Sequence, residues 1–134
     1  MAAALALGLV ALPATASVED GRRLFAGEVV LQARLAGHTD SLPGVAIRCS
    51  NCHSSGASKR PGTSGYAPPL TARSLIEPRA RRGGPPSQFD AVALCKVLRS
   101  GIDPAGVMVD TAMPRYEISN SQCASLWAYL TSQP

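Results

Sequence analysis

The sequence has few aromatic side chains and no apolar run of about 20 residues, the length that would be needed to cross a bilayer. Only 4% of its 134 residues are Phe, Trp or Tyr, whereas 12 are glycine and 11 are proline. A short, loop-rich chain that is poor in aromatics buries a modest apolar core, which excludes a large multi-domain enzyme. With 46% hydrophobic and 16% charged residues, the composition is globular rather than disordered. We therefore expect one small domain.

The N-terminus is predicted to be an export signal. Residues 2–12 form an almost unbroken apolar run that ends at a proline, and Ala14-Thr15-Ala16 fits the small-residue cleavage pattern. We expect cleavage after Ala16, so that residues 1–16 are a signal peptide and residues 17–134 form the mature periplasmic domain, without a membrane span. Because no lysine or arginine precedes the run, an ordinary N-terminal core helix is the alternative.

Basic residues concentrate between Lys59 and Arg82, where Glu77 is the only acid, and the formal net charge of the chain is +4. A docking surface for an acidic partner and a solvated loop both fit this pattern. Nucleic-acid binding is not expected, because export removes that target and no aromatic platform accompanies the basic residues.

Two of the four cysteines belong to a motif that carries chemistry. Cys49-Ser50-Asn51-Cys52-His53 has the C-x-x-C-H spacing of c-type haem attachment. Two thiols at this spacing can reach the two vinyl groups on one edge of a porphyrin, and the adjacent histidine can then bind the iron. A zinc site would need two further ligands, and His38 is the only other histidine. A thioredoxin-like site would need a βαβ setting that the sequence does not indicate. The motif predicts one covalent haem c, attached after export.

The second axial ligand of the iron is predicted to be Met113. It lies in a turn-rich loop between two expected helices, and Pro114 restricts the backbone after it. Met108 is an alternative, but it lies in an apolar stretch where packing is the default role. His38 is a further alternative, although a histidine on a surface loop is the simpler interpretation. Iron with His and Met ligands has little room for oxygen, peroxide or substrate.

Two further helices are expected from capping and periodicity. One should span residues 88–100, with Ser87 as its cap and Gly101 after its last turn. The other should span about residues 120–130 and begin at Ser119 or Asn120.

The order of these features resembles the class I cytochromes c, which are small helical electron carriers. The residues that carry the resemblance are Gly21–Phe25 in an N-terminal helix, the C-x-x-C-H motif, Gly65–Leu70 (GYAPPL), Met113-Pro114 and Leu126–Leu130 (LWAYL). The resemblance implies an all-α fold around one haem, thioether bonds from Cys49 and Cys52, and iron ligands from His53 and Met113. It also adds Pro68, Leu70 and Tyr116 as residues of the cofactor site.

The resemblance further implies specific contacts. The Pro68 carbonyl would accept a hydrogen bond from the His53 ring N–H, which would fix the orientation of the ring. Gly21 and Phe25 would meet the last helix near Trp127 and Tyr129.

The sequence departs from the family between Val29 and Arg48, where the connection to the haem motif is longer. Residues 29–35 are expected to form a short strand, and residues 38–44 a turn-rich loop. We expect a small hairpin or an irregular flap over one edge of the haem.

The remaining cysteines, Cys95 and Cys123, are candidates for a disulfide in an oxidising compartment. Two buried thiols, or pairing between chains, are the alternatives. Each cysteine lies on an expected helix beside the Met113 loop, so a bond would hold that loop and stabilise the fold by about 2–4 kcal/mol.

These features predict a periplasmic one-electron carrier rather than an enzyme. Its partners would be redox proteins, such as a donor dehydrogenase and a terminal acceptor, that dock weakly over the haem edge. A dedicated haem c subunit, fixed to an exported dehydrogenase or oxidase, is the alternative. A haem enzyme or gas sensor with an open sixth position is less favoured, because no distal acid–base pair is apparent.

Overall fold

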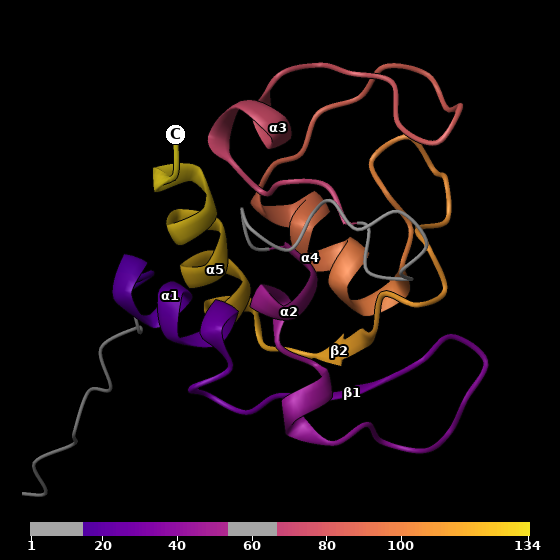
Figure 1. The fold of residues 1–134 in the computed structure, drawn as a ribbon. Helices are drawn as coiled ribbons and strands as arrows, with labels where there is room; N and C mark the ends of the chain where they lie inside the picture. Colours follow the sequence, from indigo (N-terminus) through magenta and orange to yellow (C-terminus); the bar gives the residue numbers. More distant parts are fainter. Residues whose placement is uncertain (1–14, 54–66) are drawn as a thin grey trace, which may run out of the picture.

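The computed structural model describes residues 15–53 and 67–134, and the ribbon is shown in Figure 1. Most of the predicted signal peptide (1–16) therefore lies outside the described residues, as do Gly65 and Tyr66 of the GYAPPL segment. The elements in chain order are α1 (Val18–Ala26), β1 (Gln32–Arg34), the short 3-10 helix η1 (Gly44–Ala46), α2 (Cys49–His53), α3 (Ala72–Ile76), α4 (Ala91–Ser100), β2 (Arg115–Glu117) and α5 (Asn120–Ser132). Within the described ranges, no helix is both long and apolar enough to span a bilayer.

The prediction of an all-α fold is wrong, because the structure contains a small antiparallel sheet and is mixed α/β. β1 pairs with β2, and Ala33 lies opposite Tyr116 in the centre of the pair. Both central residues are buried, so the sheet contributes to the core. The strand expected within residues 29–35 is present, but its partner is the distant strand that follows Met113. A small hairpin or an irregular flap was predicted for this segment. Leu42 turns back and donates to the Ala33 carbonyl at 2.8 Å, but no second strand forms within residues 29–48, so the segment has the irregular form. Its place over an edge of the haem stays a prediction.

Helices α1 and α5 cross closely, and Gly21 makes the crossing possible. A β-carbon at this position would overlap the backbone of Ser125 and come within 2.6 Å of Cβ of Tyr129. Phe25 extends the same contact, with its ring centroid 5.5 Å from that of Tyr129. The predicted contact with Tyr129 is confirmed, and the backbone of Ser125 lies at the same crossing. α1 begins at the Ser17 cap, and the left-handed Gly27 follows its last turn.

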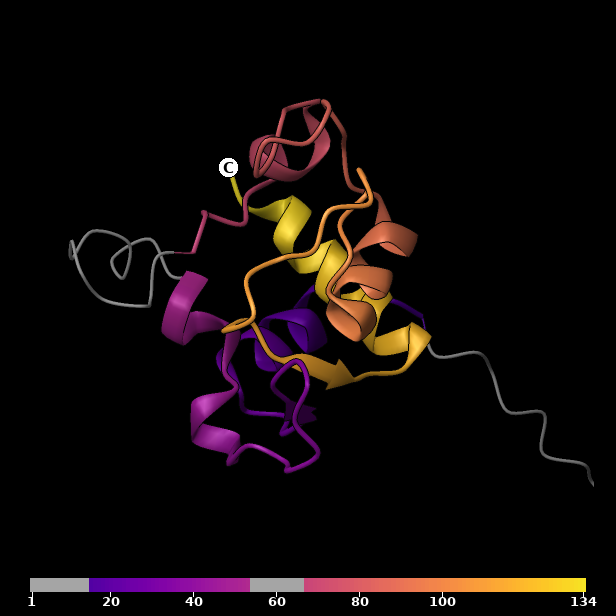
Figure 2. The same ribbon diagram turned by 90° about the vertical axis from the view of Figure 1, so that its right-hand side faces the viewer.

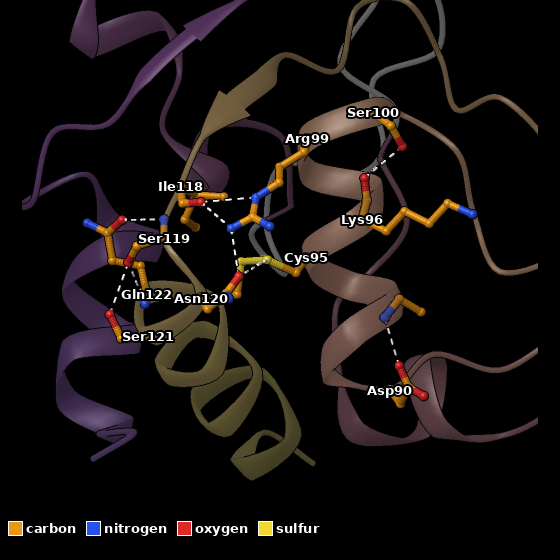
Figure 3. The surroundings of a disulfide bond; sticks show 12 residues. Asp90, Cys95, Lys96, Arg99, Ser100, Ile118, Ser119, Asn120, Ser121 and Gln122 are labelled. Atoms are coloured by element: carbon orange, nitrogen blue, oxygen red, sulfur yellow. Dashed lines mark hydrogen bonds between the residues drawn. A yellow bond between two sulfur atoms is a disulfide. The ribbon is translucent and has the colours of Figure 1, made fainter. Parts of the chain in front are cut away.

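Helices α4 and α5 form the other half of the core, and the disulfide links them. The cluster of buried side chains includes Leu94 and Leu98 of α4 and Leu126 and Leu130 of α5. Cys95 and Cys123 form the predicted disulfide, with their Cα atoms 5.4 Å apart; Figure 3 shows its surroundings.

The end predicted for α4 and the start predicted for α5 are confirmed, whereas α4 begins three residues later than predicted and α5 continues two residues further, to Ser132. Ser119 caps α5 through a capping box with Gln122, and Gly101 follows α4 with a φ of 73°. The start of α4 differs, because Asp90 rather than Ser87 accepts the hydrogen bond from the first turn. Ser87 instead pairs with Arg79 through two backbone hydrogen bonds, each 3.1 Å long.

Candidate haem site

The three functional residues of the motif lie on one turn of helix. α2 carries Cys49, Cys52 and His53, and lies between α3 and the two-strand sheet in Figures 1 and 2. The Asn51 side chain fixes this turn by donating to the Val45 carbonyl at 2.8 Å. Neither cysteine of the motif is in a disulfide; Cys52 is exposed and Cys49 is half-buried. Both thiols are therefore available for covalent attachment.

The His53 ring is oriented by the backbone, as predicted. Its Nδ1 lies 2.8 Å from the Pro68 carbonyl oxygen. Because a carbonyl can only accept, Nδ1 must carry the proton, and the lone pair of Nε2 is left for a metal. Burial lowers the pKa of His53, while the bond to Pro68 opposes this shift. The ring is thus held in the tautomer that an iron ligand requires.

The segment that supplies the Pro68 carbonyl is itself anchored by α3. The Ser74 hydroxyl donates to the Pro69 carbonyl at 2.7 Å, and Thr71 caps α3 in a capping box with Ser74. Leu70, another predicted site residue, is half-buried and packs against the core. The short helix α3 therefore fixes the chain that faces His53, and its Leu75 also joins the buried core.

Tyr116 brings β2 to the start of the haem motif. Its buried hydroxyl donates to the Ile47 carbonyl at 2.7 Å, and its side chain also interacts with the Cys49 thiol. Burial raises the pKa of Cys49 to about 11, and the interaction with Tyr116 partly lowers it. The structure therefore brings Tyr116 and Cys49 together, as expected for two residues of one site.

Met113 lies in a tight turn immediately before β2. Its backbone N–H donates to the Asp110 carbonyl at 3.1 Å, and the Asp110 side chain accepts from the Ala112 N–H at 2.8 Å. Met113 is partly buried against the core, whereas Met108 is 58% exposed. The packing role expected for Met108 is therefore wrong. His38 is exposed on its loop.

Two residues near the Met113 loop were not singled out by the sequence. Asp103 is 1% exposed, and its Oδ1 accepts from the N–H groups of Ala105 and Val107. Arg115 donates from Nη1 to the Met113 carbonyl at 2.5 Å. The turn-rich loop predicted before Met113 was a sequence signal for Asp103. Arg115 had no such signal, because its partner is a backbone atom.

The described residues fit a c-type haem, because two free thiols and one imidazole with an available Nε2 share a single turn of helix. Within residues 15–53 and 67–134, no three His, Cys, Asp or Glu side chains are grouped so that they could hold a metal ion.

Comparisons of the chain with family models, with curated proteins and with solved structures found no match, so the resemblance to the cytochromes c rests on the residues described above.

Proposed function

We propose that the protein is a periplasmic one-electron carrier with one covalent haem c. The observation that carries the proposal is the hydrogen bond between His53 and Pro68 beside two free thiols. A carbonyl that holds one ring nitrogen and leaves the other free is the arrangement that orients a histidine as a metal ligand.

Four residues of the chain would hold the haem, two by covalent bonds and two as ligands of the iron. Cys49 and Cys52 would form the thioether bonds, and His53 and Met113 would be the axial ligands. The haem supplies the one-electron change between ferric and ferrous iron. Because the chain would supply both of these ligands, no position on the iron would be left for a substrate, and electron transfer is the chemistry that such a site would support.

A basic surface beside the Pro68 segment supports docking of an acidic partner. Arg73, Arg79 and Arg82 are exposed on α3 and the loop that follows it. Arg73 and Arg79 share a single acid, Glu77, at 3.3 and 3.5 Å. The local charge is therefore positive, and it can steer association with a negatively charged protein. Lys59 and Arg60 lie outside the described residues.

The proposal is tested by optical spectra of the protein produced together with haem-maturation machinery. We expect covalent haem, a low-spin spectrum in both oxidation states, and no response when carbon monoxide is added to the reduced form. A high-spin spectrum or rapid gas binding would indicate an open iron and favour a ligand-binding or enzymatic role. The absence of covalent haem would refute the proposal.

The sixth ligand is tested by Met113→Ala, with Met108→Ala as the matched control. Met113→Ala should open the iron to carbon monoxide and remove the weak far-red absorption that sulfur ligation gives ferric haem. Met108→Ala should leave both unchanged, because that side chain is exposed. The reverse result would assign the ligand to Met108.

A dedicated haem subunit is the second candidate, and an apolar surface near the motif favours it. Val30 and Val45 are 72% and 65% exposed, and Val30 contributes to a groove that Ile47 and Cys49 also line. Val30 also lies against Gly44, the neighbour of Val45 in sequence, so exposed apolar residues occur on both sides of this groove, as a permanent interface would need. Stable co-purification with an exported dehydrogenase or oxidase would support this candidate, and a monomer that exchanges freely would support the carrier.

A further inference from the structure

We propose that Arg115 is a positioning residue for Met113, holding the backbone of the Met113 turn against the end of α4. The inference rests on the proposed function, because it concerns how the chain presents the Met113 thioether to the iron.

The first observation is the hydrogen bond from Arg115 to the Met113 backbone. Nη1 of Arg115 donates to the Met113 carbonyl oxygen at 2.5 Å. A guanidinium bond to a carbonyl is charge-assisted, so it is stronger than the neutral bonds elsewhere in this loop. It acts on the peptide group of Met113 itself, and so restricts where the thioether can point.

The second observation is that Gly101 leaves the space that the guanidinium occupies. Gly101 is buried at the end of α4, and a β-carbon on it would overlap Nε and Cζ of Arg115. Its φ of 73° is the left-handed conformation that favours glycine. Gly101 therefore ends α4 and also leaves the space into which the Arg115 guanidinium packs.

Two negative charges oppose the cost of partly burying the Arg115 guanidinium. The C-terminal end of α4 carries the partial negative charge of the helix dipole, which is stabilised by a positive side chain in contact with it. Partial burial disfavours the charged guanidinium, and the negative charge of Asp110 opposes that effect. The guanidinium is thus attracted to the place where it meets Met113.

The backbone bonds of the loop complete the connection. Val109 donates to the Gly101 carbonyl at 2.8 Å, and Met113 donates to the Asp110 carbonyl at 3.1 Å. The first bond ties the loop to the residue that follows α4, and the second closes the Met113 turn. The Arg115 guanidinium packs against the same glycine while it holds the Met113 carbonyl. Arg115 therefore closes the loop at the residue that we propose as the ligand.

The consequence concerns the competition between Met113 and other ligands. A thioether is a weak ligand, so its occupancy depends on how well the protein holds it in place. Loss of a residue that orients a metal ligand commonly costs 10–100-fold in affinity. Imidazole, which must displace the methionine to bind ferric iron, should therefore bind more tightly when Arg115 is removed.

The experiment compares Arg115→Met with Arg99→Met in the holoprotein. Arg99 is a matched control, because its Nε and Nη2 donate to the Ile118 carbonyl at 3.0 and 2.6 Å, as Figure 3 shows. It is also an arginine near the end of α4 that holds a backbone carbonyl, but not that of Met113. We expect Arg115→Met to raise the affinity for imidazole about tenfold and to weaken the far-red sulfur band. Arg99→Met should change neither the imidazole affinity nor the sulfur band. Arg115→Lys should lie between the wild-type protein and Arg115→Met in both measurements.

A second variant keeps the proposal testable if Arg115→Met folds poorly. Gly101→Ala should displace the guanidinium and produce a similar rise in imidazole affinity. In a double-mutant cycle, Gly101→Ala should add little to Arg115→Met, because both changes remove the same contact.

The outcomes separate the two proposals. If the wild-type protein shows the sulfur band and Arg115→Met leaves the band and the imidazole affinity unchanged, the positioning role is refuted and the carrier proposal stands. An equal effect of Arg99→Met would likewise refute it, since a general loss of stability would then explain both. If the wild-type protein shows no sulfur band, both the Met113 ligand and the positioning role are wrong.

Discussion

Among single residues, Tyr116 makes the connection between the sheet and the haem motif. Its buried hydroxyl holds the Ile47 carbonyl, two residues before Cys49. We predict that Tyr116→Phe leaves this carbonyl without its partner and lowers the free energy of unfolding by about 1–3 kcal/mol. The midpoint of urea unfolding should fall while the slope stays constant, which would mark a loss of stability without a change in compactness.

Tyr129→Phe is the control for this prediction. The Tyr129 ring packs against Phe25, but its hydroxyl makes no hydrogen bond within the described part of the chain. Removing that hydroxyl should therefore change the unfolding midpoint little. Equal effects of the two substitutions would show that the bond to Ile47 contributes nothing specific.

Between elements, the disulfide between α4 and α5 holds the ends of the Met113 loop. Cys95 and Cys123 are 28 residues apart in sequence, and the loop they enclose contains Met113. Closing a loop of this size stabilises by about 2–4 kcal/mol through the entropy of the unfolded chain. We predict that Cys95→Ala/Cys123→Ala lowers the free energy of unfolding by this amount, measured in urea with the iron ferrous in both proteins.

A reducing agent provides the control for the disulfide. It should destabilise the wild-type protein and leave the double variant unchanged, since the variant has no bond to break. If the reductant lowers the midpoint of both proteins equally, the stabilisation does not come from this disulfide.

The elements also show what local sequence can predict. The end of α4 and the start of α5 were predictable because Gly101 and Ser119 act on their own neighbours. The pairing of Ala33 with Tyr116 was not, because strands of three residues leave almost no pattern and the two partners lie far apart in sequence. The all-α prediction failed for this reason.

In the candidate site, too, some contacts could be predicted from the sequence and others could not. The motif and its resemblance gave Pro68 as the acceptor for His53, and that bond is present. The role of Arg115 was not predictable. It binds a backbone carbonyl and lies against a glycine, and neither contact involves a partner side chain that could be recognised in the sequence.

In the molecule as a whole, the turn that carries Cys49, Cys52 and His53 lies outside the buried core. The buried cluster is formed mainly by α1, α4, α5 and the sheet, whereas neither η1 nor α2 contributes a fully buried residue. The side of the fold that carries Cys49 and Cys52 is therefore weakly consolidated by the chain alone. A covalently bound haem would supply the missing apolar contacts.

Removal of the haem should therefore destabilise the molecule, and most strongly around α2. We predict that Cys49→Ala/Cys52→Ala, purified free of haem, loses at least about 3 kcal/mol, which is the stabilisation by a ligand present at roughly 100 times its Kd. Urea unfolding would measure the loss of stability. Amide hydrogen exchange should show that protection is weakened more in residues 44–53 than at the crossing of α1 and α5. Mass spectrometry would verify that the disulfide is intact in both proteins. Equal midpoints and uniform exchange would mean that the chain forms this fold without a cofactor, and that the haem plays no part in its stability.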